Sequence, residues 1–88
     1  MERDVQKQIT KYLEGKGYYV VKVIKANKSG VPDLLACSNQ GKFYGIEVKD
    51  KGKKKNVTKL QMLHIDLINK AGGVAFVADS IEDVKEQL

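Results

Sequence analysis

Residues 33–49 read DLLACSNQGKFYGIEVK, and this stretch decides how the chain folds. Segments 33–38 and 42–49 are rich in apolar residues typical of strands, and Asn39-Gln40-Gly41 separates them. A three-residue loop of this kind forms a type I turn followed by a glycine in the left-handed conformation. We therefore predict an antiparallel hairpin in which Ser38 pairs with Lys42.

Counting outward from this turn places Asp33 directly opposite Glu47, with both side chains on one face of the hairpin. Opposed Cβ atoms lie about 4.5–5.5 Å apart, so the two carboxylates repel each other unless a cation bridges them. Lys49 follows Glu47 by two residues and therefore shares that face. A loop one residue shorter or longer would put the two carboxylates on opposite faces.

Carboxylate oxygens at this position suit Mg²⁺ or Mn²⁺, which also bind substrate phosphate. Asp33, Glu47 and Lys49 therefore predict a metal-dependent phosphodiesterase site. The metal would activate a water, and the lysine would orient that water or stabilise the charge on the phosphate. The alternative is a solvated surface hairpin with incidental charges.

The rest of the sequence predicts one mixed α/β domain over residues 1–88. Apolar residues recur at helical spacing in 2–14 and in 58–71. The expected inward face of the second segment consists of Leu60, Leu63, Leu67, Ile68 and Ala71. Segment 18–24 predicts a strand covered on both faces, and segment 74–78 predicts another strand. Ser80 is expected to cap a last short helix. The order is helix, three strands, helix, strand, helix.

Composition narrows the class of protein. One cysteine and one histidine exclude an internal disulfide, a Cys/His zinc site and a multi-histidine nuclease site. The short apolar runs and the charged N-terminus lead us to expect a cytoplasmic protein without a membrane span or leader. Sixteen Lys and Arg against 11 Asp and Glu, a net charge of +5, favour a polyanionic partner such as nucleic acid.

Pro32-Asp33, followed after fourteen residues by Glu47-Val48-Lys49 in an αβββαβ order, resembles the PD-(D/E)xK nuclease superfamily. The finer pattern is similar to its VRR-NUC branch, the virus-type replication-repair nuclease domain, often a compact stand-alone protein in phages. Glu2 and Gln6 in the first helix, residues 30–35 and Gln61 in the second helix belong to that pattern. The resemblance implies a restriction-endonuclease-like α/β fold, with a mixed sheet flanked by helices.

The resemblance also implies roles for individual residues. Asp33, Glu47 and the Val48 carbonyl would be metal ligands, and Lys49 would be the catalytic lysine. Glu2 would complete the metal shell, often through water, although an acid is also favourable at the positive end of a helix. Gln61 has two readings, a residue of the catalytic site or the partner of Thr58 in a capping box.

Basic loops flank the expected site. The lysines of segments 51–55 and 25–28 would contact the DNA backbone without reading sequence, unless the lysine-rich loop is merely mobile and solvated. His64 and Cys37 are expected outside the site. The DNA-binding set is Lys25, Lys28, Lys51, Lys53, Lys54 and Lys55.

We therefore expect a divalent-metal-dependent, structure-selective DNA endonuclease. Minimal members of the group resemble Holliday-junction resolvases, and 88 residues leave little surface for substrate, so we expect a homodimer that acts on branched DNA in DNA repair. One alternative is a non-catalytic basic DNA-binding or assembly module with the same fold, and another is cleavage of RNA, as in tRNA-processing relatives of the superfamily.

Overall fold

The hairpin at the centre of the chain has the register that the sequence predicts. In the computed structural model, which describes residues 1–88, β2 (Leu34–Cys37) and β3 (Phe43–Val48) are antiparallel, with Leu34 opposite Ile46. Gly41 has a φ of 84°, and the Ser38 amide donates to the Lys42 carbonyl at 2.9 Å. The same register, continued by one residue, sets Asp33 against Glu47.

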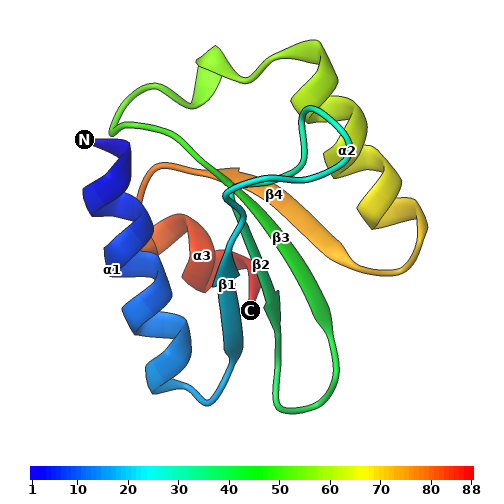
Figure 1. The fold of residues 1–88 in the computed structure, drawn as a ribbon. Helices are drawn as coiled ribbons and strands as arrows, with labels where there is room; N and C mark the ends of the chain where they lie inside the picture. Colours follow the sequence, from blue (N-terminus) through cyan, green and yellow to red (C-terminus); the bar gives the residue numbers. More distant parts are fainter.

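Four strands form one mixed sheet in the order β1-β2-β3-β4 (Figure 1). The outer strand β1 pairs with β2 in antiparallel fashion, whereas β4 is parallel to β3 and is reached through a helical crossover. This confirms the predicted α/β class and element order. The remaining elements are α1 (Glu2–Gly15), β1 (Tyr19–Lys22), the 3₁₀ helix η1 (Lys54–Asn56), α2 (Lys59–Lys70), β4 (Val74–Ala78) and α3 (Ile81–Gln87).

The hydrophobic core lies between the sheet and the two helices α1 and α3. Side chains from these helices pack on the alternate strand residues that face them, as the predicted periodicities require. Burial of this apolar surface supplies most of the stability of a domain this small. The core residues are Val5, Ile9, Leu13, Leu34, Ala36, Tyr44, Ile46, Val48, Ala78 and Val84.

The opposite face of the sheet is only partly covered, because α2 packs on β3 and β4 alone. The prediction that segment 18–24 is covered on both faces is therefore wrong: it forms the short edge strand β1, and Tyr19 is 71% exposed. The predicted inward face of α2 is only partly right, since Ile68 packs against Gly45 of β3 but the buried residue of the helix is Ile65. Leu60, Leu63 and Leu67 of that face are each about half exposed.

Local signals fix the ends of the helices and the loop before the site. Thr58 and Ser80 cap α2 and α3 as expected. Gly30 has a φ of 88°, and a Cβ there would lie 2.9 Å from the Leu60 carbonyl oxygen, so only glycine lets this loop approach α2 so closely. None of the helices combines the length and the apolar character that crossing a bilayer requires.

Candidate active site

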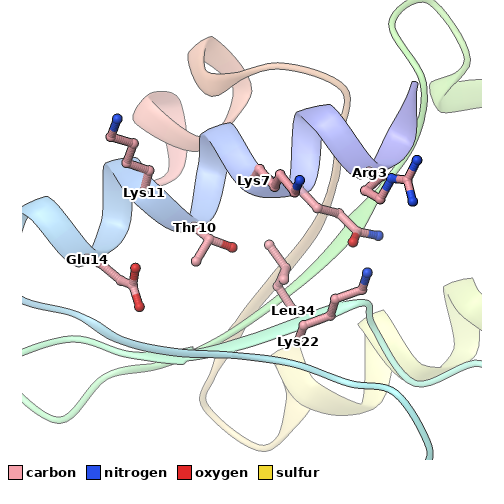
Figure 2. Close-up of a pocket in the computed structure, with 8 residues that line it drawn as sticks. Arg3, Lys7, Thr10, Lys11, Glu14, Lys22 and Leu34 are labelled. Carbon is pink, nitrogen blue, oxygen red and sulfur yellow. The ribbon is translucent and has the colours of Figure 1, made fainter.

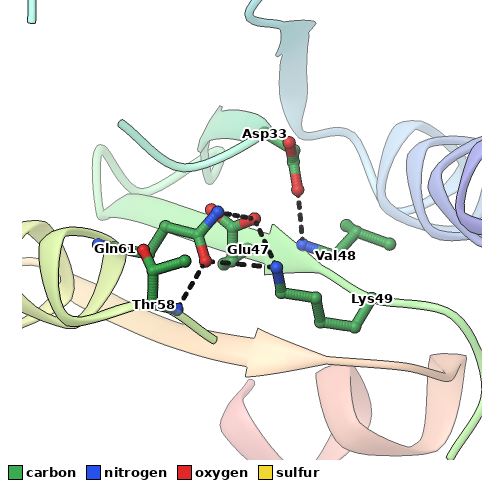
Figure 3. Close-up of polar contacts among 6 residues, drawn as sticks. All are labelled: Asp33, Glu47, Val48, Lys49, Thr58 and Gln61. Atoms are coloured by element: carbon green, nitrogen blue, oxygen red, sulfur yellow. Dashed lines mark hydrogen bonds and ion pairs between the residues drawn. The ribbon is translucent and has the colours of Figure 1, made fainter. Parts of the chain in front are cut away.

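Asp33 is held by the main chain at the point where β2 begins. Its carbonyl accepts the Val23 amide at 2.8 Å, and its side-chain Oδ2 accepts the Val48 amide at 2.8 Å (Figure 3). The carboxylate oxygen therefore accepts the Val48 amide in place of a backbone carbonyl, just beyond the last paired residues of β2 and β3. Its orientation is fixed by backbone groups of two neighbouring strands, and not by a flexible side chain.

Glu47 lies in the middle of the sheet, between β2 and β4, and is 3% exposed. Burial, the hydrogen bond with the Asp33 carboxyl and the negative charge of Asp33 together raise its pKa from 4.5 to about 8, whereas Lys49 acts in the opposite direction. Two carboxyl groups in contact cannot both ionise readily in such a place. Without a metal ion, the pair of Asp33 and Glu47 carboxyl groups therefore holds one proton near neutral pH.

Lys49 and Gln61 complete a network around this pair (Figure 3). The Lys49 ammonium, on a residue only 9% exposed, lies 3.7 Å from Glu47 Oε2 and donates to Gln61 Oε1 at 3.1 Å. The Gln61 Nε2 group donates to the same Glu47 oxygen at 3.1 Å. Helix α2 thereby fixes both Glu47 and Lys49 from the side.

Gln61 forms the capping box and also contacts the charged network, whereas its role in a catalytic site stays a prediction. Its Oε1 accepts the Thr58 amide at 2.9 Å, and its own amide donates to Thr58 Oγ1 at 3.1 Å, which is a complete capping box. The same side chain bonds Lys49 and Glu47. The start of α2 and the charged network therefore depend on one glutamine.

Glu2 lies near the network without joining it. Its charge raises the pKa of Glu47, the smallest of the effects on that group. Glu2 itself is exposed on the first turn of α1. No three His, Cys, Asp or Glu residues converge, so the acidic donors of the network are Asp33 and Glu47 alone. The structure thus brings Asp33, Glu47, Val48, Lys49 and Gln61 together and leaves Glu2 at the margin.

The lysine-rich loop is anchored by polar contacts that the sequence did not reveal. Lys54 pairs with Asp83 at 2.9 Å, an interaction that raises the pKa of Lys54, and the Gly52 amide donates to Asp79 at 2.9 Å. These contacts tie the loop to the start of α3, so it is not the unanchored segment that its composition indicates. Lys25, Lys28, Lys51, Lys53 and Lys55 are exposed and form no ion pair.

His64 and Cys37 lie outside the network, as expected. Both are half-buried: His64 faces the groove beside the loop before Asp33, and Cys37 lies among apolar side chains of the uncovered sheet face. Sequence reasoning missed a basic groove beside α1, lined by Arg3, Lys7 and Lys11 among others. Their spacing of four residues on one helix face was the available signal.

A mixed sheet with a carboxylate pair and a lysine where β2 begins and β3 ends defines a nuclease-type domain. The family model of the VRR-NUC domain matches residues 2–82. A solved structure described as a VRR_NUC domain is 31% identical, with a TM-score of 0.81, over 97% of this chain and 90% of that one. Curated proteins give no match. The chain therefore belongs to the VRR-NUC domain family.

We expect the metal-free protein to lose stability as the pH rises. The folded-state pKa of Glu47, about 8, exceeds its ordinary value of 4.5, so the folded protein binds this proton more tightly than the unfolded chain. The stabilisation is complete below pH 4.5 and is lost as the pH rises through 8. Thermal unfolding with a chelator measures this loss, and Glu47→Gln should remove it. An equally steep decline in Glu47→Gln would contradict the assignment.

The two roles of Gln61 can be separated without an activity assay. Thr58→Ala and Gln61→Ala should each lower the free energy of unfolding by about 1 kcal/mol, because both break the capping box. Only Gln61→Ala removes a hydrogen bond donated to the Glu47 carboxylate, so only that variant should raise the pKa of Glu47 further. Carbon-13 NMR titration of the carboxyl groups measures this. The same Glu47 titration in both variants would leave Gln61 as a cap alone.

Proposed function

We propose that this protein is a divalent-metal-dependent DNA endonuclease that hydrolyses phosphodiester bonds. The observation that carries the proposal is the β2–β3 register, which sets Asp33 against Glu47, together with the Lys49 ammonium 3.7 Å from Glu47. A buried carboxyl with a pKa of about 8 is unfavourable as structure alone, and such perturbed groups gather at functional sites. Membership of a nuclease-type family supports the same reaction.

The residues present fit a hard divalent cation. Two carboxylates in contact would each ionise beside Mg²⁺ or Mn²⁺, and the Val48 carbonyl would add a third oxygen from the same strand. Glu2, on the first turn of α1, would enter the shell through water. A bound ion would supply a Lewis acid for the phosphate oxygens and would lower the pKa of a coordinated water.

The protein's own contribution is to hold one ammonium group in a defined place. Lys49 lies between Glu47 and Gln61, so its Nζ has two fixed partners and keeps one N–H for the substrate. That N–H would donate to a phosphate oxygen, or to the attacking water, and so stabilise the charge that develops in the transition state. Gln61 acts as a positioning residue for both Glu47 and Lys49.

The exposed lysines around the site favour nucleic acid as the substrate. Lys25 and Lys28 lie in the loop before Asp33, and Lys51, Lys53 and Lys55 follow Lys49. Contacts of this kind bind the backbone irrespective of base sequence, which suits recognition of DNA structure. Lys54 would contribute less, because it is paired with Asp83.

An apolar surface next to the site supports a homodimer. Exposed or half-buried side chains on the uncovered sheet face continue onto α2, and they lie on the same face as Asp33 and Glu47. A contiguous apolar patch on a small domain marks an interaction surface, and a symmetric contact there would present two sites to branched DNA. The patch consists of Tyr19, Val21, Leu35, Cys37, Phe43 and Leu67.

Cleavage should require both the metal and the network. Wild type, Lys49→Ala and Asp33→Asn are incubated with labelled four-way junction, flap, duplex and single-stranded DNA in Mg²⁺, Mn²⁺ or chelator. We expect metal-dependent nicks that each variant slows by about 100-fold or more. The side-chain oxygen that Asp33→Asn retains would still accept the Val48 amide, so the fold is kept. Lys42→Ala, at the far end of β3, is the control.

Two outcomes would contradict this proposal. Undiminished cleavage by Asp33→Asn or Lys49→Ala would remove these residues from catalysis. Salt-sensitive DNA binding without cleavage in any metal would instead identify a non-catalytic DNA-binding or assembly module of the same fold. Preferential nicking of the four-way junction, at symmetric positions, would support the branched-DNA assignment.

The dimer is tested by sedimentation of wild type and Phe43→Lys. Phe43 is 44% exposed in the patch, so a lysine is tolerated by the monomer but would place two like charges in a symmetric contact. We expect wild type to sediment as a dimer and Phe43→Lys as a monomer. The control is Ile24→Lys, since Ile24 is 83% exposed outside the patch. A wild-type monomer that still nicks both arms of a junction would overturn the dimer.

A further inference from the structure

A second basic feature lies on the other side of the sheet, between α1 and the edge strand β1. It is a groove of about 310 Å³ whose lining contains four cationic residues and one acidic residue. Figure 2 shows the charged ends of Arg3, Lys7 and Lys22 gathered towards the N-terminal end of α1, with Lys11 and Glu14 at the other end. One end of the groove is therefore cationic without a compensating acid.

These cations have no partner within the protein. Arg3, Lys7 and Lys22 are exposed and form no ion pair. Arg3 and Lys7 are four residues apart on one helix, a spacing at which like charges disfavour the helix. The Gln6 side chain lines the same groove, and its Oε1 is buried without a hydrogen-bond partner. The three unpaired cations are donors that an anionic ligand would satisfy, whereas the Gln6 oxygen is an acceptor and does not itself favour an anion.

The cationic end of the groove adjoins the candidate active site. Leu34, which lines the groove, directly follows Asp33 and is paired with Lys22. The neighbouring Val23 amide donates to the Asp33 carbonyl at 2.8 Å. On the helix side, Arg3 lies two residues from Met1, whose ammonium is 3.4 Å from Asp50 Oδ1, just after Lys49. A strand leaving the site around the end of β2 would enter the groove here.

We propose that this groove holds the phosphates of the nucleic-acid strand on one side of the scissile bond. The proposal rests on the proposed nuclease function and adds the path of the substrate. Arg3 to Lys11 spans about 12 Å of helix at 1.5 Å per residue, which corresponds to roughly three or four nucleotides of one strand. Arg3, Lys7 and Lys22 bind the phosphate backbone of this strand. The groove is therefore a different feature from the lysine-rich loop that follows β3.

The test compares two pairs of neutralised lysines of equal charge change. Lys7→Gln with Lys22→Gln alters the groove, and Lys42→Gln with Lys70→Gln alters exposed lysines at the far end of the sheet. Steady-state cleavage of duplex and junction DNA is measured over a range of salt concentrations. The groove pair should raise KM about tenfold at moderate salt, keep kcat within about twofold, and reduce the salt slope by about 1.8. The control pair should match wild type.

Substrates with single neutral methylphosphonates locate the contact along the strand. In wild type, replacements at two to four successive positions on one side of the scissile phosphate should raise KM, and the groove pair, which retains only Arg3, should be less sensitive to them. If wild type cleaves DNA but the groove pair and the control pair have equal KM values, the groove proposal is contradicted and the nuclease proposal is not.

The groove can also be tested if no variant cleaves. Fluorescence anisotropy of labelled DNA in chelator then measures binding alone. Weaker, less salt-dependent binding by the groove pair than by the control pair would support the groove even though the nuclease proposal had failed. An equal loss of affinity for polyglutamate and for DNA would instead indicate a general anion site and would overturn the nucleic-acid path.

Discussion

The register of the β2–β3 hairpin is the constraint on which the rest of this structure depends. A shift of the register by one residue would send Glu47 to the core face and Ile46 to the opposite face. The hydrophobic core and the carboxylate pair therefore depend on the same register. The left-handed Gly41 and the Ser38–Lys42 hydrogen bond fix that register at the turn. At the other end, Asp33 fixes it again through the Val48 amide. The site is thus built from a contact that the fold already needs.

The electrostatics of the site follow from this placement. Burial and the neighbouring Asp33 carboxyl raise the pKa of Glu47 to about 8, and the Lys49 ammonium offsets only part of that rise. Gln61 is bound at once to the N-terminus of α2 and to the charged pair. The helix and the site therefore constrain each other, and a divalent ion would replace the shared proton as the source of charge balance.

The two faces of the sheet have different roles. The face towards α1 and α3 carries a dense apolar core, which gives an 88-residue chain its stability. The other face is covered only over β3 and β4, and there the charged network lies beside exposed apolar side chains. Basic residues from the loops and from α1 surround the end of the sheet where the two regions meet. The proposed reaction site, self-association surface and polyanion path would thus lie a short distance apart on this small domain.

The sequence by itself determined the features that depend on near neighbours. The turn at 39–41, the pairing of Asp33 with Glu47, the helix caps at Thr58 and Ser80 and the order of elements all follow from a few adjacent residues. Only the tertiary structure decided that β1 is an exposed edge, that Ile65 and not the leucines of α2 is buried, that Lys54 is paired with Asp83, and that Gln61 reaches Glu47. The physical reason is that burial and pairing depend on which distant segments pack together. Periodicity within one segment says which residues share a face, but not whether another element covers it.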